Sequence, residues 1–168
     1  MVFGTADMVV TPTGLRFAGR KFPCTLGRGG VTADKREGDM ATPAGVHRII
    51  GLLYRPDRIP RPADWAEPIL HGDLWSDDPR DQDYNSHVRA PHRFSHESLR
   101  RADPMYDLVM VTDWNMIPPT PGRGSAIFVH RWRNTGHPTA GCVALSADDL
   151  LWIARRIGYG SRLIVPQP

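Results

Sequence analysis

Residues 125–145 have the sequence SAIFVHRWRNTGHPTAGCVAL. The apolar run at 126–130 predicts a short buried strand that ends at His130. A polar loop follows, and Cys142 stands between Gly141 and a second apolar run at 143–145. The small residues before Cys142 allow the backbone to turn tightly beside the sulfur. The segment therefore predicts two strands joined by a loop, with a histidine at its start and a cysteine at its end.

A histidine and a cysteine placed in this way are suited to nucleophilic catalysis. A nearby imidazole can lower the pKa of a thiol and give a thiolate at neutral pH. Backbone N–H groups in a tight turn can stabilise an oxyanion. We therefore expect Cys142 to be a nucleophile and His130, twelve residues earlier, to be its base. Papain-like proteases have the cysteine before the histidine in the sequence, so the order here argues against that family.

Two other interpretations of the same residues remain open. Cys142 can be a small buried hydrophobic residue and His130 an ordinary histidine at a strand end. Alternatively, His130, His137 and Cys142 can bind zinc, although a fourth ligand is not obvious and the spacing matches no standard zinc finger.

The sequence around this segment predicts a mainly β domain with one main late helix and long loops. Ser146 is a good N-cap for the helix, and Asp149 three residues later resembles a capping box. Apolar residues at 150, 153, 154 and 157 give the helix one buried face. Gly and Pro number 16 each, which favours short strands and turns. The predicted strands are residues 8–10, 15–17, 22–26, 46–54, 107–112, 126–130 and 162–165.

Residues 55–101 form a long stretch that is rich in Pro, Asp, Arg and His, with isolated aromatic residues such as Trp75 and Tyr84. Loops of this length in a small domain are usually functional covers or binding loops. The alternative is an insertion that only packs on the surface.

Length and composition limit the classes of function. The 168 residues fit one domain, residues 1–168. The net charge is +3, and the arginines are scattered with no run longer than two, so we expect no nucleic-acid partner. Two cysteines are too few for a disulfide scaffold, and we expect Cys24 to be buried as a small apolar residue. No stretch approaches the roughly 18 apolar residues of a membrane span.

Three motifs in this order resemble the L,D-transpeptidase (YkuD-like) family. The first is GRGG at 27–30 followed by KREGDMATPAG at 35–45, which is similar to the family's K-x-G-D-x-x-T-P-x-G element. The second is GSAIFVH at 124–130. The third is TAGC at 139–142, which is similar to the family's [Ser/Thr]-x-Gly-Cys signature. On residues alone, GRGG can be a phosphate cradle, but a plain turn fits better because no P-loop lysine follows.

The resemblance implies a sandwich-like β domain and an acyltransferase that acts on peptidoglycan stem peptides. Cys142 would attack the meso-diaminopimelate carbonyl of a donor peptide and release D-alanine, and the thioester would pass to an amine. His130 would move the proton, the carbonyl of Arg131 would orient the imidazole, and the N–H groups of Gly141 and Cys142 would hold the oxyanion. The resemblance implies no metal or organic cofactor, and it implies carbapenems as covalent inhibitors. A catalytically degenerate peptidoglycan-binding module is the alternative from a different class.

The sequence departs from many relatives in two ways. Ala140 stands where relatives often have His, Lys or Arg, so the role of that side chain is lost or is taken by His137. The loop from His130 to Cys142 is also short, as in a compact proteobacterial branch of the family. Some members of that branch join L-alanine to diaminopimelate in 1,3 cross-links instead of 3,3 links between two diaminopimelates, and this favours 1,3 links.

Several further residues are candidates for binding the substrate. Asp39 and Thr42 are expected to shape a turn beside the site. An arginine can hold a stem-peptide carboxylate through two parallel hydrogen bonds, and loop aromatics often line grooves. The substrate-binding candidates are Thr139, Trp132, His137, Arg123, Arg28 and Tyr84, with Trp75 as a further groove residue.

The substrate class implies a periplasmic location. Residues 1–10 contain Asp7 and lack a basic start followed by an apolar stretch, so they do not predict a secretory signal. A cytoplasmic location and unconventional export are therefore the alternatives.

Overall fold

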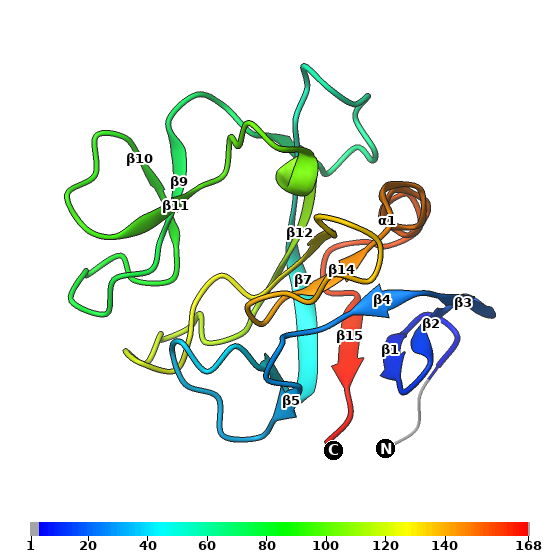
Figure 1. Cartoon of the computed structure of the whole chain (residues 1–168). Helices are drawn as coiled ribbons and strands as arrows, with labels where there is room; N and C mark the ends of the chain where they lie inside the picture. The colour runs from blue at the N-terminus through cyan, green and yellow to red at the C-terminus, as the bar shows by residue number, and fades with distance from the viewer. Residues whose placement is uncertain (1–3, 168) are drawn as a thin grey trace.

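A computed structural model describes residues 4–167 of the chain, which form a mainly β domain with a single α-helix among the described residues (Figure 1). This confirms the fold class predicted from the sequence. The domain predicted at 1–168 includes residues 1–3 and 168, which lie outside the described part. The strands are β1 (Met8–Thr11), β2 (Gly14–Phe17), β3 (Arg20–Phe22), β4 (Cys24–Thr25), β5 (Val31–Thr32), β6 (Thr42–Pro43), β7 (Gly45–Tyr54), β8 (Glu67–Pro68), β9 (Asp73–Ser76), β10 (His87–Arg89), β11 (His96–Ser98), β12 (Leu108–Thr112), β13 (Phe128–Arg131), β14 (Val143–Leu145) and β15 (Arg162–Val165).

The main sheet has the strand order β3-β2-β1-β15-β7-β12-β13-β14-β4, with β8 paired to β7. Strands β3 and β4 stand at opposite ends of this order, yet only Pro23 separates them in the sequence. The sheet therefore curls back on itself around its larger hydrophobic cluster. This curled, layered sheet accounts for the sandwich-like domain that the sequence motifs implied.

Both faces of the central strands are buried, because alternate side chains of β12 belong to two different clusters. Leu108 and Met110 point into the larger cluster, which also contains residues of β1, β2, β7 and the helix. Val109 and Val111 point into the smaller cluster. Side chains alternate between the faces of a strand, so the register alone assigns each residue to one cluster.

The helix α1 (Ala147–Ala154) begins as the sequence predicts. Ser146 is the N-cap, and its hydroxyl accepts a 3.1 Å hydrogen bond from the Asp149 N–H and donates to the Asp149 carboxylate at 2.7 Å. Leu150, Ile153 and Ala154 are buried against the larger cluster. These contacts fix the end of β14 and therefore the strand that follows Cys142.

The long segment between β7 and β12 folds over the smaller cluster. Its strands β9, β10 and β11 form a separate three-stranded sheet to one side of the main sheet (Figure 1). The 3-10 helix η1 (Pro104–Tyr106) leads back to β12. Trp75 and Tyr106 from this segment pack edge-on against Phe128 of β13, with ring centroids 5.0 and 6.0 Å apart. The segment is therefore a packed cover over one face of the sheet.

Two strand boundaries differ from the sequence prediction. The strand predicted at 22–26 is divided into β3 and β4 at Pro23, which has no N–H to donate to a ladder. The strand predicted at 126–130 begins only at Phe128, because Ala126 has a left-handed backbone with φ of 51°. Both breaks are local backbone features that an apolar run cannot reveal.

Among the described residues, no helix has the length and apolar character needed to cross a lipid bilayer.

Candidate active site

Cys142 and His130 lie on the same face of two neighbouring parallel strands. The pairing of β13 with β14 places Val129 opposite Val143 and His130 opposite Ala144. Continuing that register backwards places Cys142 beside Phe128, and the Phe128 N–H does donate to Cys142 Sγ at 3.4 Å. Because side chains alternate, Phe128, His130 and Cys142 all face the cover segment.

These two side chains line one cavity of about 490 Å³. Its walls come from the turn at 139–142, the loop at 125–127, the start of the loop after β13, and the cover segment. Cys142 has 9% of its surface exposed and His130 has 3%, so both are nearly buried at the base of the cavity. The residues that line it are Arg28, Glu37, Met40, Asp77, Glu97, Arg101, Met105, Tyr106, Ser125, Ala126, Ile127, His130, Trp132, Arg133, His137, Pro138, Thr139, Ala140 and Cys142.

The turn that carries Cys142 is held by hydrogen bonds from both sides. The Thr139 hydroxyl donates to the Cys142 carbonyl at 2.6 Å and accepts from the Gly141 N–H at 3.1 Å. The Thr139 N–H donates to the Leu26 carbonyl at 2.9 Å, and the Arg28 N–H donates to the Thr139 carbonyl at 2.9 Å. Thr139 was expected to bind substrate. It does line the cavity, but its hydroxyl is used to shape the turn.

Gly141 is required by this turn. Its φ is 142°, in a region that side-chain-bearing residues rarely adopt, and an added Cβ would lie 2.9 Å from the Ala41 carbonyl oxygen. Because the Gly141 N–H already donates to Thr139, it is not free for the oxyanion role that the sequence motifs implied. The Cys142 N–H has no hydrogen-bond acceptor within residues 4–167 and remains available for that role.

The glycine-rich run at 27–30 supports the same turn and provides no phosphate cradle. An added Cβ on Gly27 would lie 2.3 Å from the Met40 carbonyl oxygen, and one on Gly29 would lie 2.5 Å from that of Asp39. The run therefore packs backbone to backbone against residues 39–42. Of the two sequence interpretations, the structural turn is correct.

Asp39 and Thr42 hold the segment on which this run packs, as expected. The Asp39 carboxylate accepts hydrogen bonds from the N–H groups of Arg36 and Ala41 and a 2.7 Å ion pair from Lys35. The Thr42 hydroxyl accepts from the Gly27 N–H at 2.8 Å. The partners of Asp39 hold the pKa of its carboxyl below the usual value against the opposing effect of burial.

His130 is oriented by the carbonyl that the motifs implied. His130 Nδ1 lies 2.7 Å from the Arg131 carbonyl oxygen. A carbonyl can only accept, so Nδ1 carries the proton and Nε2 is left as the basic nitrogen. The Tyr106 ring packs edge-on against the imidazole with centroids 5.3 Å apart and limits its rotation.

Burial makes both members of the pair neutral. It raises the pKa of the Cys142 thiol to about 12, although the hydrogen bond from the Phe128 N–H favours the thiolate. It lowers the pKa of His130 to about 4, although the bond to the Arg131 carbonyl acts in the opposite direction. Cys142 Sγ also donates to the Ala126 carbonyl at 3.2 Å, which requires the thiol proton. The resting thiolate expected from the sequence is therefore wrong, because removal from water outweighs the effect of the imidazole.

Not every predicted binding residue lines this cavity. Arg28, Trp132 and His137 do, together with Thr139. Arg123 instead lies over the Trp114 ring, with its guanidinium carbon 5.7 Å from the centroid. Tyr84 is buried and donates to the Glu37 carboxylate at 2.9 Å, so it supports a lining residue from behind.

Two other predicted residues also lie outside the lining. Trp75 lies in the smaller cluster, where its indole N–H donates to Asn85 at 3.0 Å. Cys24 is half-buried beside the larger cluster, and burial raises the pKa of its thiol to about 11. Neither residue reaches the cavity that contains Cys142.

Sequence reasoning missed the cover-segment residues that complete the cavity. Glu97, Arg101 and Tyr106 come from this segment and line the side facing His130. Asn85 is buried and ties the cover to the loop before β13, since its side-chain oxygen accepts from both the Trp75 indole and the Ala126 N–H. Its sequence signal was only that of a turn-former, because its partners lie far away in the chain.

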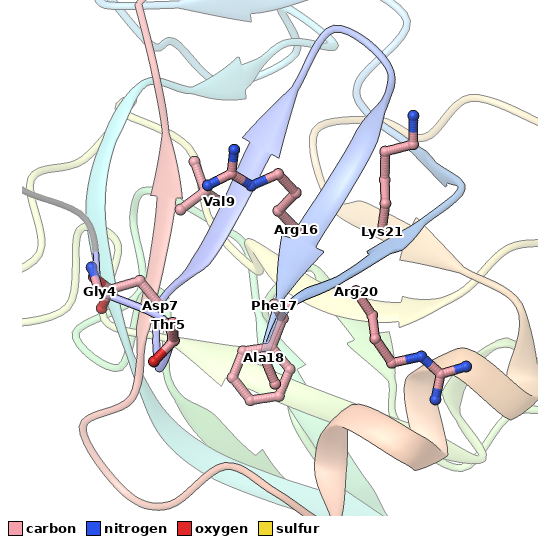
Figure 2. A pocket seen from close by; sticks show the side chains of 10 residues that line it. Gly4, Thr5, Asp7, Val9, Arg16, Phe17, Ala18, Arg20 and Lys21 are labelled. Atoms are coloured by element: carbon pink, nitrogen blue, oxygen red, sulfur yellow. The ribbon is translucent and has the colours of Figure 1, made fainter.

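A second hollow of about 320 Å³ lies beside the N-terminal strands and is lined by Arg16, Arg20 and Lys21 (Figure 2). It contains no nucleophile or histidine, so it is not a candidate for acyl transfer. In a different test of the alternatives, no three His, Cys, Asp or Glu side chains within residues 4–167 are placed to hold a metal ion. The zinc interpretation of His130, His137 and Cys142 therefore gains no support.

The model of the L,D-transpeptidase catalytic domain (YkuD) matches residues 9–165 of this chain. The chain belongs to this family. Among solved structures, an L,D-transpeptidase from Mycobacterium smegmatis is similar, with 15% sequence identity and a TM-score of 0.41. The match covers 91% of this chain and 52% of that protein, so this L,D-transpeptidase domain spans about half the length of that relative. No curated protein sequence matches the chain.

Proposed function

We propose that this chain is a peptidoglycan L,D-transpeptidase in which Cys142 is the nucleophile and His130 the general base. The observation that carries the proposal is the meeting of Cys142, His130 and the Arg131 carbonyl at one cavity in a member of this family. The donor would be a stem peptide with meso-diaminopimelate followed by D-alanine. The reaction uses only side chains and backbone of this chain.

The first half-reaction forms a thioester. The thiol leaves the Ala126 carbonyl and passes its proton to His130 Nε2 as the sulfur attacks the diaminopimelate carbonyl carbon. The Cys142 N–H stabilises the oxyanion. The bond to the D-alanine nitrogen then breaks, and His130 returns the proton to that nitrogen. A neutral thiol and a neutral imidazole suit this sequence, because charge appears only while the proton is on the imidazole.

The second half-reaction transfers the acyl group to an amine. The amine attacks the thioester carbon, and His130 Nε2 removes a proton from the attacking nitrogen. The carbon–sulfur bond breaks, and His130 returns this proton to the sulfur. The free thiol is thereby restored and an amide cross-link is formed.

The cross-link type and the location belong to the proposal. We favour 1,3 links between L-alanine and diaminopimelate over 3,3 links, because the loop from His130 to Cys142 is short, with eleven residues between them. A periplasmic location follows from the substrate class. Carbapenems are proposed as inhibitors that acylate Cys142.

The test uses purified protein with a synthetic donor tetrapeptide and an acceptor stem peptide, followed by liquid chromatography and tandem mass spectrometry. We expect release of D-alanine and a cross-linked product whose fragments contain the L-alanine to diaminopimelate amide. Cys142→Ala is expected to form neither. A wild-type protein that binds the peptides without releasing D-alanine would favour the degenerate binding module.

A further inference from the structure

Glu97 places a carboxylate in the same cavity as the nucleophile. It lies in the middle of β11, where it pairs with Trp75 of β9, and its side chain reaches the cavity wall. One carboxylate oxygen accepts a 2.6 Å hydrogen bond from the Tyr106 hydroxyl. The described chain provides no hydrogen bond to the other oxygen, so this oxygen is available to a ligand.

The contacts of Tyr106 place Glu97 close to the reacting groups. The Tyr106 ring that donates to Glu97 packs against the His130 imidazole with centroids 5.3 Å apart. The charge of Glu97 also raises the pKa of the Cys142 thiol. A group bound by Glu97 would therefore lie beside a thioester formed on Cys142.

The charges around Glu97 favour a cationic ligand. Asp77 lines the same cavity, and its buried Oδ1 has no hydrogen-bond partner within residues 4–167. The nearby cation, Arg101, is held by Asp103 through hydrogen bonds of 3.0 and 2.6 Å. A half-buried carboxylate beside a second one is stabilised by a cation that donates hydrogen bonds.

We propose that Glu97 binds the ammonium group of the acceptor and so selects amines over water in the second half-reaction. This rests on the proposed transpeptidase function. An acceptor amine reaches the site as an ammonium ion at neutral pH, and three N–H donors suit the free oxygen of Glu97 and the buried oxygen of Asp77. Bound there, the amine is held next to the thioester and loses a proton to solvent before it attacks.

The test compares how the acyl-enzyme divides between aminolysis and hydrolysis. With a donor tetrapeptide and an acceptor stem tripeptide, Glu97→Gln is expected to lower the ratio of cross-linked to hydrolysed product about tenfold, since a hydrogen bond to a charged group is lost. D-alanine release without acceptor is expected to stay within about threefold of wild type, since acylation needs no acceptor. Glu97→Asp, which keeps the charge, is expected to retain most of the ratio.

Two comparisons separate binding of an ammonium ion from a structural effect. Hydroxylamine is largely uncharged at neutral pH, so its aminolysis is expected to be equal in wild type and Glu97→Gln. Glu67→Gln, at an exposed carboxylate outside this cavity, is expected to change neither ratio. Should Glu97→Gln not fold, Asp77→Asn replaces it and is expected to lower the ratio in the same direction.

Equal loss of cross-linking with the stem peptide and with hydroxylamine, or an unchanged ratio, would overturn the proposal for Glu97. Failure of the wild-type protein to release D-alanine would instead overturn the transpeptidase function itself. The two failures are therefore distinguishable in one set of assays.

Discussion

At the residue scale, the site is defined by two neutral groups whose ionisation is suppressed by burial. The Sγ–H of Cys142 is held by the Ala126 carbonyl, and the Nδ1–H of His130 by the Arg131 carbonyl. Catalysis in such a pair depends on transferring a proton when the substrate is bound, with no standing ion pair in the free protein. This distinguishes the site from one that stores a reactive thiolate.

The raised pKa of Cys142 predicts a slow reaction with a simple alkylating reagent. We expect iodoacetamide to modify Cys142 more slowly than it modifies free cysteine at pH 7, with a rate that rises up to at least pH 9. Mass spectrometry of the Cys142 peptide over time measures this rate. A rate that is fast and flat from pH 6 upward would show a resting thiolate and contradict the neutral pair.

The lowered pKa of His130 predicts a pH dependence of stability. Between about pH 4 and 6.5 the unfolded chain binds a proton at this residue that the folded chain does not, so stability rises with pH across this window. The contribution is at most about 3 kcal/mol, present above the unfolded pKa and lost as pH falls toward the folded one. Urea unfolding from pH 4 to 7 should show a shallower slope in His130→Gln. His47, whose pKa burial also lowers, acts in the same direction in both proteins, so the difference isolates His130.

At the element scale, the turn before β14 depends on glycine. Gly141→Ala is expected to lower the free energy of unfolding by about 1–3 kcal/mol, since the new methyl group requires a strained φ and contacts the Ala41 carbonyl. It is also expected to abolish acylation, because the sulfur moves with the turn. Gly158→Ala is the matched control, because its added Cβ meets nothing within 4 Å. Equal stability and activity of the two variants would show that the turn tolerates a side chain.

The cover segment depends on Asn85 for its attachment to the loop before β13. Asn85→Ala leaves the buried Trp75 indole and Ala126 N–H groups without their acceptor, and each such loss costs about 1–3 kcal/mol. We expect a lower melting temperature and slower acylation, measured by thermal unfolding and by a carbapenem adduct time course. If Asn85→Ala unfolds like wild type and acylates at the same rate, the cover is not held through this residue.

At the scale of the whole molecule, the sequence predicted those features that depend on local patterns. The strands at 8–10, 46–54 and 162–165, the Ser146 cap and the paired placement of His130 and Cys142 follow from apolar periodicity and turn chemistry. The cover segment was left open between a binding loop and a surface insertion, because its short strands are defined by pairing with one another and by packing on β13.

The parts of the site that sequence reasoning missed share one physical cause. Glu97 and Tyr106 reach the cavity only because the cover folds onto the face of β13 that carries His130. The neutral state of Cys142 likewise follows from the degree of burial, which no residue spacing gives. Long-range packing therefore decides the electrostatics of this site, while local sequence decides the position of its nucleophile.

The most direct test of the central claim is intact-protein mass spectrometry after incubation with a carbapenem, with peptide mapping of any adduct. We predict one stable adduct per chain of the wild-type protein, located on Cys142, with slower formation in His130→Gln and none in Cys142→Ala. The Cys142→Ala protein should melt close to wild type, because only one sulfur atom is removed. An adduct that persists in Cys142→Ala, or a wild-type protein that forms none, would contradict Cys142 as the nucleophile.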